Sequence, residues 1–397
     1  MNQPIRPGIL KKYDIDTQKM KYTLLLDMNS IMKMSLVDTR CGNNGYQYGM
    51  VFQTLLQIKM MLDKKTWDSV YAIYDGDNSG YLRYQFYKDY KANRDKKYME
   101  HSTETQYDKY ISDYVHRVME YSRKKKTDKK NAENTSKNKY ENDDENFQRQ
   151  RAIIFSILEE ISFRQIICEE VEGDDIIAQY VKERDSHENI VIVTSDRDLT
   201  QLVNDNVSVY IPKLKKFITP KNDKELLGCP ACNILLKKQI CGDSSDNIKG
   251  IKGMGETTLY KYFPKILTEK VELNYVLSES KKINEERVKA KKKPIQSLDN
   301  IVNRITEGSQ GKDIFEVNKR IIDLSEPLLT EDALSEFHEL KDSVIDPNGR
   351  SFENVYNIIL KNKMTDLMGE NHFSSFFSSF NSICEKEKSK FIKNNDK

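Results

Sequence analysis

The amino-acid sequence predicts an α/β fold built on a mostly parallel central sheet with helices on its faces. Three observations support this prediction: short apolar runs recur along the chain, segments with helical spacing separate them, and acidic residues follow most of the runs. Buried parallel strands have continuous apolar sequences, and the crossovers between them are usually helices. Because such sheets bind ligands beyond the carboxyl ends of their strands, the acidic residues are candidates for one shared site.

The apolar runs are the expected strands. Residues 22–26 (YTLLL) stop at Asp27, residues 69–74 stop at Asp75, and residues 190–193 stop just before Ser195 and Asp196. Two further runs have the same character, at residues 165–168 and 207–211. Apolar residues at helical spacing predict helices over residues 46–63, 147–161 and 172–181, and successive amphipathic helices from about residue 296 onward.

Length and composition limit the class of protein. The chain has 397 residues, 38% hydrophobic and 32% charged, which allows one large or two modest cores with much solvated surface. No apolar run approaches the ~20 residues that span a membrane, and the start lacks the apolar core of a signal peptide. Six scattered cysteines indicate a reducing compartment. We therefore expect a soluble protein of the cytoplasm, and we also expect it to be a monomer.

Composition shifts divide the chain. We expect a flexible extension at residues 1–20, an α/β core at 21–220, a helical region at 221–383 and a polar tail at 384–397. Residues 121–145 carry eight basic and six acidic residues with little apolar content, so they form a disordered insert or an exposed helical extension. Residues 281–293 form a second insert, which is basic and helix-prone, with seven positive and two negative charges.

Nine carboxylates fall in five short segments at element ends, and they are candidate metal ligands. They are Asp27, Asp75, Glu172, Asp174, Asp175, Asp196, Asp198, Asp243 and Asp246. Oxygen ligands suit Mg²⁺ or Mn²⁺, and the absence of His from the five segments argues against zinc. Nine carboxylates exceed the needs of one octahedral ion, so two ions are the natural account. Any single aspartate, such as Asp198, could instead cap a helix.

The net charge is +2, but without the nine carboxylates the remaining residues carry +11. An acidic pocket on a basic background suits a metal-dependent enzyme with a polyanionic substrate. Charges that merely alternate on solvated faces explain the totals equally well. The charge totals alone therefore do not distinguish an acidic pocket from an ordinary charged surface.

Two further motifs suit nucleic acid. Alternating glycines at 250–255 (GIKGMG) precede a predicted helix at 256–263 and would present backbone N–H groups to a phosphate. A dinucleotide-binding turn is less consistent, because no buried strand precedes the glycines. Residues 81–94 interleave tyrosines with cations, which offers stacking surfaces and phosphate contacts, although the tyrosines taken singly fit core packing as well.

In this order the motifs resemble the 5′-nuclease (flap endonuclease) superfamily, in particular its phage branch. The matching segments are LLLDMNS, YDGDNSGYLR, YKANR, VEGDDIIA, TSDRDLTQL, the strand pair around VSVYIPKLKKF, and CGDSSDNIKGIKGMG. The resemblance covers residues 20–265 and extends more loosely through the C-terminal helices. It implies a PIN-like 5′-nuclease core, a helical arch over residues 81–146, a helix–hairpin–helix element at 240–263 and a helical C-terminal region.

The resemblance also implies roles for single residues. The first metal would be held by Asp27, Asp75, Glu172 and Asp174, and the second by Asp174, Asp196, Asp198 and Asp243, with support from Asp175 and Asp246. Lys91 and Arg94 would act as catalytic cations at the scissile phosphate. DNA would contact Arg83, Lys91, Arg94, Lys249, Gly250, Lys252, Gly253 and Gly255, and K⁺ is a candidate ion at the glycine hairpin. Relatives often carry Lys or Arg after the last glycine, whereas Glu256 follows here.

The expected function is that of a Mg²⁺-dependent, structure-specific 5′-nuclease. It would hydrolyse RNA primers or 5′ DNA flaps near duplex junctions during replication, by a two-metal mechanism. The substrates would be DNA and RNA–DNA hybrids with a 5′ single-stranded end. The alternatives are a PIN-like endoribonuclease, which would not need the glycine hairpin, and a non-catalytic nucleic-acid-binding module, which would not need all the carboxylates. Single-strand-binding protein and a sliding clamp are candidate partners, without a clear docking motif in the sequence.

Overall fold

The structure is a computed structural model that describes residues 20–93, 143–305, 313–368 and 372–396. Its centre is a six-stranded sheet with the order β3-β2-β1-β4-β5-β6. Strands β1 to β5 run parallel and β6 is antiparallel at one edge, so the predicted mostly parallel sheet is confirmed. The strands are β1 Lys21–Asp27, β2 Ser69–Ile73, β3 Arg164–Ile166, β4 Glu188–Val193, β5 Val207–Ile211 and β6 Lys216–Ile218.

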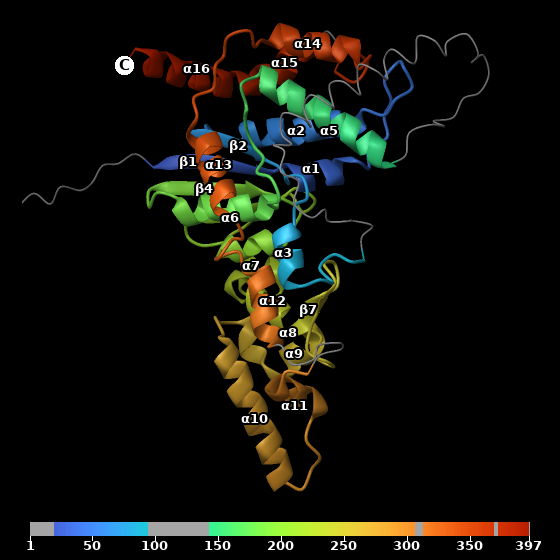
Figure 1. Cartoon of the computed structure of the whole chain (residues 1–397), viewed down its shortest axis with the longest axis vertical. Coiled ribbons are helices and arrows are strands. Elements are labelled where there is room, and N and C mark those ends of the chain that lie inside the picture. The colour runs from blue at the N-terminus through green and yellow to red at the C-terminus, as the bar shows by residue number, and fades with distance from the viewer. Residues whose placement is uncertain (1–19, 94–142, 306–312, 369–371, 397) are drawn as a thin grey trace, which may run out of the picture.

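Helices bury both faces of the sheet (Figure 1). Leu24 and Leu26 of β1 face one core, and Leu25 faces the other. The first core includes helices α1 (Met28–Ser35), α2 (Gly49–Leu62) and α5 (Asp143–Glu160), and the second includes α6 (Gly173–Glu183). A strand buried on both faces needs apolar residues at every position, which explains the unbroken run at 24–26.

The strand order reverses at β1, which lies between β2 and β4. The crevice beyond the carboxyl ends of strands at such a reversal is where open parallel sheets bind ligands. Asp27 ends β1, Asp75 follows β2, and Asp196 follows β4. The topology therefore brings three of the acidic segments to one edge of the sheet.

A second, helical lobe extends away from that edge. It contains α7 (Asp223–Leu227), α8 (Ile234–Cys241), α9 (Glu256–Tyr262), α10 (Leu273–Lys289), α11 (Gln296–Asn303) and α12 (Ile314–Ile322). Two-residue strands, β7 (Gly242–Asp243) and β8 (Ile248–Lys249), pair antiparallel between α8 and α9. Helices α8, α9, α10 and α11 share one apolar core. Figure 1 places α10 and α11 at the end of the molecule farthest from the sheet.

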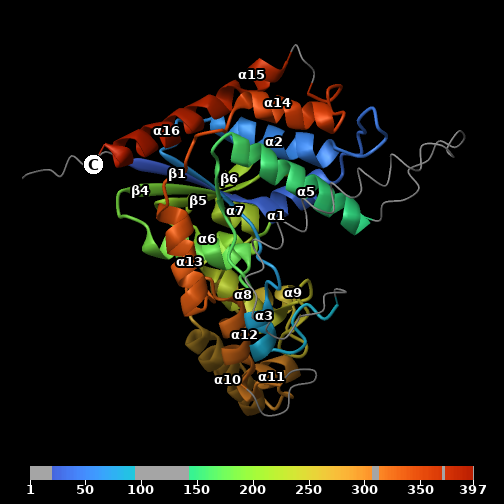
Figure 2. The same ribbon diagram turned by 45° about the horizontal axis from the view of Figure 1, so that its top comes forward.

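After α12 the chain returns to the sheet through α13 (Glu331–Asp342), which lies beside α6 in Figure 2. It then continues as α14 (Phe352–Lys361), α15 (Phe373–Phe377) and α16 (Asn381–Asn395). The segment expected as a polar tail from residue 384 is mostly exposed, and it is helical, because residues 384–395 continue α16. One face of that helix is buried at Cys384 and Glu387, and Glu387 Oε2 lies 2.9 Å from Nη2 of the buried Arg164.

Several predicted segments fall on residues that the structure does not describe. Arg94, residues 1–19 and most of the charged insert at 121–145 lie outside the described residues. The basic insert at 281–293 forms the end of α10 and the turn after it. Within the described part of the chain, no helix combines the length and apolar character needed to cross a membrane.

Candidate active site

A pocket of about 950 Å³ opens at the carboxyl ends of β1, β2 and β4. Seven of the nine candidate carboxylates line it, namely Asp27, Asp75, Glu172, Asp174, Asp196, Asp198 and Asp246. Its lining also includes Lys91 and Tyr90, but neither His nor Cys among the described residues. The structure therefore brings together residues that are spread over more than two hundred positions of the sequence.

The inner wall of the pocket is formed by Asp27, Asp75 and Asp174. Asp27 accepts hydrogen bonds from Ser30 N at 3.0 Å and from Thr194 Oγ1 at 2.6 Å, which fix its carboxylate between β1 and β4. Asp75 Oδ1 accepts a bond from Gly173 N at 2.9 Å, at the start of α6. Asp174 lies in the first turn of the same helix.

Burial and mutual repulsion oppose ionisation of this group. Burial raises the pKa of Asp27 to about 7, despite the bonds from Thr194 and Ser30, and the charges of Asp75 and Asp196 add to the rise. Burial also raises the pKa of Asp174 well above its usual range, followed by the charges of Asp196, Asp27 and Asp75. Buried carboxylates that repel one another, without a nitrogen or sulfur ligand, are the donor set that suits a hard divalent cation.

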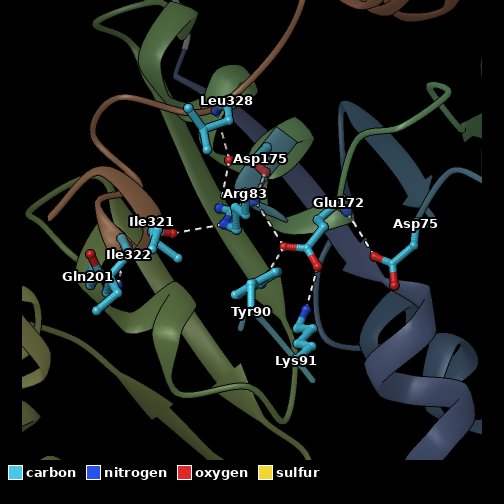
Figure 3. A network of polar contacts seen from close by, with 11 residues as sticks. Asp75, Arg83, Tyr90, Lys91, Glu172, Asp175, Gln201, Ile321, Ile322 and Leu328 are labelled. Carbon is cyan, nitrogen blue, oxygen red and sulfur yellow. Dashed lines mark hydrogen bonds and ion pairs between the residues drawn. The ribbon is translucent and has the colours of Figure 1, made fainter. Parts of the chain in front are cut away.

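Glu172 differs from these carboxylates because cations surround it (Figure 3). Its carboxylate binds Lys91 Nζ, lies 2.9 Å from Arg83 Nη1, and accepts a bond of 2.8 Å from the Tyr90 hydroxyl. Burial would raise the pKa of Glu172, but the charges of Lys91 and Arg83 outweigh it and lower the pKa to about 2. Glu172 is therefore ionised, and Lys91 and Arg83 balance its negative charge.

Arg83, which lines the pocket, forms a buried ion pair with Asp175. They are 5% and 1% exposed, and Arg83 Nη2 donates to Asp175 Oδ1 at 3.0 Å. Arg83 Nε also donates to the Ile321 carbonyl at 2.8 Å, and Leu328 N donates to Asp175 Oδ1 at 2.9 Å (Figure 3). Arg83 lines the pocket, so its contact with DNA stays a prediction, whereas the Asp175 carboxylate accepts bonds from Arg83 and Leu328 N and does not line the pocket.

Asp198 and Asp246 line the outer part of the pocket, and Asp243 lies next to them without lining it. These three carboxylates can place oxygens within 4.8 Å of one another. Lys238 of α8 binds Asp198 and also donates to Asp243 Oδ2 at 2.5 Å. Burial raises the pKa of Asp198 to about 6, and Lys238 only partly opposes the rise. Sequence reasoning missed Lys238, although its position one turn before Asp243 on an amphipathic helix was a usable signal.

The cationic segment at residues 87–93 docks on the loop that carries Asp246. Lys91 N donates to the Asp246 carbonyl at 2.9 Å, and Asn247 Nδ2 donates to the Asp89 carbonyl at 2.8 Å. The predicted catalytic Lys91 is thus held at the pocket by backbone contacts as well as by Glu172.

The glycine hairpin lies beside the pocket, on the helical lobe. A Cβ on Gly250 would come within 2.1 Å of the Cys241 carbonyl carbon, so the β7–β8 turn requires glycine there. Gly253 has φ +79°, and Gly255 caps α9. Lys249 and Lys252 are exposed, and neither forms an ion pair within the described ranges. These residues do not line the pocket, and they form a separate surface next to it.

Comparison with known proteins identifies related sequences. Residues 22–228 match the family model described as 5′-3′ exonuclease, N-terminal resolvase-like domain. The thermostable DNA polymerase I of Thermus thermophilus is 34% identical over 149 residues, which are 37% of this chain and 17% of that protein. The 5′-3′ exonuclease of Buchnera aphidicola is 34% identical over 106 residues, or 26% of this chain and 37% of that protein. The chain thus spans only a small part of the length of the first of these relatives.

Solved structures share the fold. The T5 5′-exonuclease with bound zinc ions superposes with a TM-score of 0.51 at 15% identity, covering 88% of this chain and 98% of that one. The flap endonuclease of bacteriophage T5, in a complex with DNA and metal ions, gives a TM-score of 0.51 at 15% identity and covers 87% and 100%.

Proposed function

The chain belongs to the family described as 5′-3′ exonuclease, N-terminal resolvase-like domain, and on this premise we propose that it is a divalent-metal-dependent, structure-specific 5′-nuclease. Its substrates would be RNA primers and 5′ DNA flaps next to a duplex junction. The observation that carries the proposal is the pocket itself, which places seven carboxylates opposite Lys91 and beside the glycine hairpin. Acidic groups for metal, a cation for phosphate and a duplex-binding turn are the parts that such a reaction needs.

We propose Mg²⁺ as the ion, with Mn²⁺ as a substitute. The inner ion would be held by Asp27, Asp75 and Asp174 with Glu172 nearby, and the outer one by Asp174, Asp196, Asp198 and Asp243 with support from Asp246. When bound, the two ions would activate a water and stabilise the leaving oxygen of a phosphodiester. The pocket's oxygen-only donors support this choice of metal. K⁺ at the hairpin is proposed from the family resemblance alone.

The protein's own groups would position the phosphate. Lys91 is the cation that would stabilise charge developing on the scissile phosphate, and Arg83 with the Tyr90 hydroxyl would keep Glu172 compensated when Lys91 turns toward substrate. The exposed Lys249 and Lys252 would bind the backbone of the adjoining duplex. A role for Arg94, a monomeric state, and binding to single-strand-binding protein or a sliding clamp remain predictions.

Three labelled substrates test the function: 5′-flap DNA, an RNA–DNA hybrid and single-stranded RNA, each with Mg²⁺ and with EDTA. We expect cleavage of the first two near the junction, and a loss on the order of 10²- to 10³-fold or more in Asp174→Ala. Cleavage of single-stranded RNA alone would favour an endoribonuclease. Binding of the flap without Mg²⁺-dependent cleavage would favour a non-catalytic module.

A further inference from the structure

The turn between α10 and α11 carries an uncompensated cluster of lysines. Lys289, Lys291, Lys292 and Lys293, which we call the basic tip, are all exposed. None of them forms an ion pair with any carboxylate in the described part of the chain, whereas Lys282 farther back on α10 lies 3.6 Å from Glu279. Four neighbouring lysines repel one another, so a tip of this kind gains most from a polyanion.

The tip has a defined backbone. Lys291 adopts φ +55° at the end of α10, where glycine is the unstrained choice, and Lys292 N donates to the Arg287 carbonyl at 2.8 Å. Arg287 Nε also donates to the Lys293 carbonyl at 2.8 Å. These contacts hold the lysines at set positions around the turn.

A buried asparagine ties the two helices together. Asn284 Oδ1 accepts a bond from Ile295 N at 2.8 Å, and Asn284 Nδ2 donates to Asp299 Oδ1 at 2.6 Å and to the Ile295 carbonyl at 3.2 Å. Because Asn284 belongs to α10 and Asp299 to α11, the helical hairpin is braced just behind the basic tip.

The other end of this helical hairpin is fastened to the glycine hairpin. Asn300 Nδ2 of α11 donates to the Lys252 carbonyl at 2.9 Å, and Lys252 N donates to the Ile305 carbonyl at 3.1 Å. Ile251 and Met254 share an apolar core with Leu298 and Ile301. The glycine hairpin and the basic tip therefore belong to one rigid lobe.

Figure 1 shows the sequence of features along the long axis of the molecule: the sheet, then α3 and α12, then α8 and α9, and finally α10 and α11. A Cβ on Gly253 of the glycine hairpin would lie 3.5 Å from the Ser297 Cβ at the start of α11, and Lys293 of the tip comes only four positions before Ser297. Four residues span at most about 14 Å, which corresponds to about four base pairs of duplex. The tip thus lies about that far beyond the glycine hairpin, in the direction away from the pocket.

We propose that the basic tip binds the phosphate backbone of the duplex arm, about four base pairs beyond the contact made by the glycine hairpin. This inference rests on the proposed function and extends its substrate-binding surface. Lysines supply charge to a backbone without reading bases, so the contact is independent of sequence. A membrane surface is less suitable, since Val288 is the one large apolar side chain in the described 285–293 segment and an interfacial helix needs an apolar face.

The test uses the full chain and a quadruple Lys→Gln variant at positions 289, 291, 292 and 293. A matched control carries Lys→Gln at 361, 363, 388 and 393, which are also exposed lysines but lie on or next to α14 and α16 at the opposite end of the molecule. Binding to 5′-flap DNA is measured by fluorescence anisotropy in EDTA, with duplex arms of increasing length and at several salt concentrations.

We expect the affinity of the parent protein to rise in two steps as the arm grows, separated by about four base pairs. The tip variant should lose the second step, which lowers affinity for long arms on the order of 10-fold to 100-fold and reduces the salt slope by about three. The control variant should keep both steps. An unchanged tip variant, or an equal loss at every arm length, would overturn the proposal.

Cleavage separates this proposal from the function on which it rests. The parent protein is incubated with Mg²⁺ and a flap whose duplex arm is too short to reach the tip. If this substrate is cleaved while the tip variant still shows both binding steps, only the basic tip is wrongly assigned. If it is not cleaved, the proposed nuclease function fails, whatever the binding data show.

Discussion

Glu172 illustrates how a buried charge is maintained at the pocket. Its carboxylate is shared by Lys91, Arg83 and Tyr90, and each partner is itself held: Arg83 by Asp175 and Lys91 by the backbone of Asp246. Removing one partner from such a buried network leaves a charge uncompensated, which usually costs more than the pair contributes. Lys91 is the member nearest to solvent, with 14% of its side chain exposed, so it is the one that can exchange Glu172 for a phosphate.

We predict that Lys91→Ala slows the chemical step far more than it weakens binding. The side chain faces the pocket and not the glycine hairpin, so its loss should remove charge from the scissile phosphate and leave the duplex contacts intact. The expected fall in single-turnover rate is on the order of 10²- to 10³-fold. The dissociation constant for flap DNA, measured in EDTA, should change by a factor of about three or less.

Lys88→Ala is the matched control, because Lys88 is exposed on the same segment and does not line the pocket. Its cleavage rate should remain near that of the parent. Equal losses in rate and affinity for Lys91→Ala would instead assign Lys91 to general backbone binding.

The sequence motifs predicted which carboxylates gather at one site, but not the direction in which each carboxylate side chain points. Asp174 and Asp175 are adjacent in a GDD motif, and the helical turn of about 100° between them points one at the pocket and the other at Arg83. Which of the two faces inward depends on how α6 packs against the sheet, and this is a tertiary property. Lys238 escaped notice for a similar reason, since its partners Asp198 and Asp243 come from other elements.

At the scale of elements, the strands were predictable because burial on both faces forces unbroken apolar runs. The helices from about residue 296 onward were also predicted, but the continuation of α16 beyond residue 384 was not. Residues 384–397 look polar in sequence, but α16 buries Cys384 and matches its buried Glu387 with Arg164 from β3. A helix held through a long-range ion pair leaves no periodic apolar signal in the local sequence.

A second long-range contact joins α6 to α13, which lie side by side in Figure 2. Glu183 accepts bonds from His338 Nε2 at 2.8 Å and from Lys341 Nζ at 2.9 Å. Partial burial would raise the pKa of Glu183, but these bonds and one from Gln179 outweigh it and lower the pKa to about 2. A carboxylate whose pKa is lower in the folded state stabilises the fold above its unfolded pKa of about 4.3.

We therefore predict that Glu183→Gln lowers the free energy of unfolding by about 1 kcal/mol or less at pH 7, since the carboxylate is partly exposed. The difference from the parent should shrink as the pH falls from about 4.3 toward 2, because the native carboxylate is then protonated. Urea denaturation between neutral pH and the most acidic pH at which the fold persists measures this trend. Glu225→Gln is the matched control, since it alters a more exposed carboxylate 3.7 Å from Lys216, and it should change the free energy of unfolding at pH 7 by less than Glu183→Gln does.

At the scale of the whole molecule, charge is segregated. The pocket concentrates carboxylates at the sheet edge, while unpaired lysines occupy the glycine hairpin and the basic tip of the helical lobe. A phosphate backbone drawn along the lobe would reach a site that repels it unless cations are bound there. Metal binding and DNA binding are therefore expected to reinforce each other, and metal should stabilise the fold on its own.

Two adjacent substitutions test the role of metal in that stability. A ligand that binds only the folded state, present at 100 times its dissociation constant, adds about 2.7 kcal/mol to the free energy of unfolding. Mg²⁺ should therefore raise the melting temperature of the parent protein relative to EDTA.

Asp174→Asn should reduce this Mg²⁺-dependent rise without loss of stability in EDTA, because it removes a carboxylate that its neighbours repel. Asp175→Asn should do the reverse: it removes one of the two buried carboxylates that balance Arg83 and costs about 3 kcal/mol in EDTA, yet keeps the response to Mg²⁺. Thermal melts of the three proteins at several Mg²⁺ concentrations separate the two effects. If Asp175→Asn lost the Mg²⁺ response as completely as Asp174→Asn, Asp175 would have to turn toward the metal, and its burial against Arg83 would not describe the metal-bound protein.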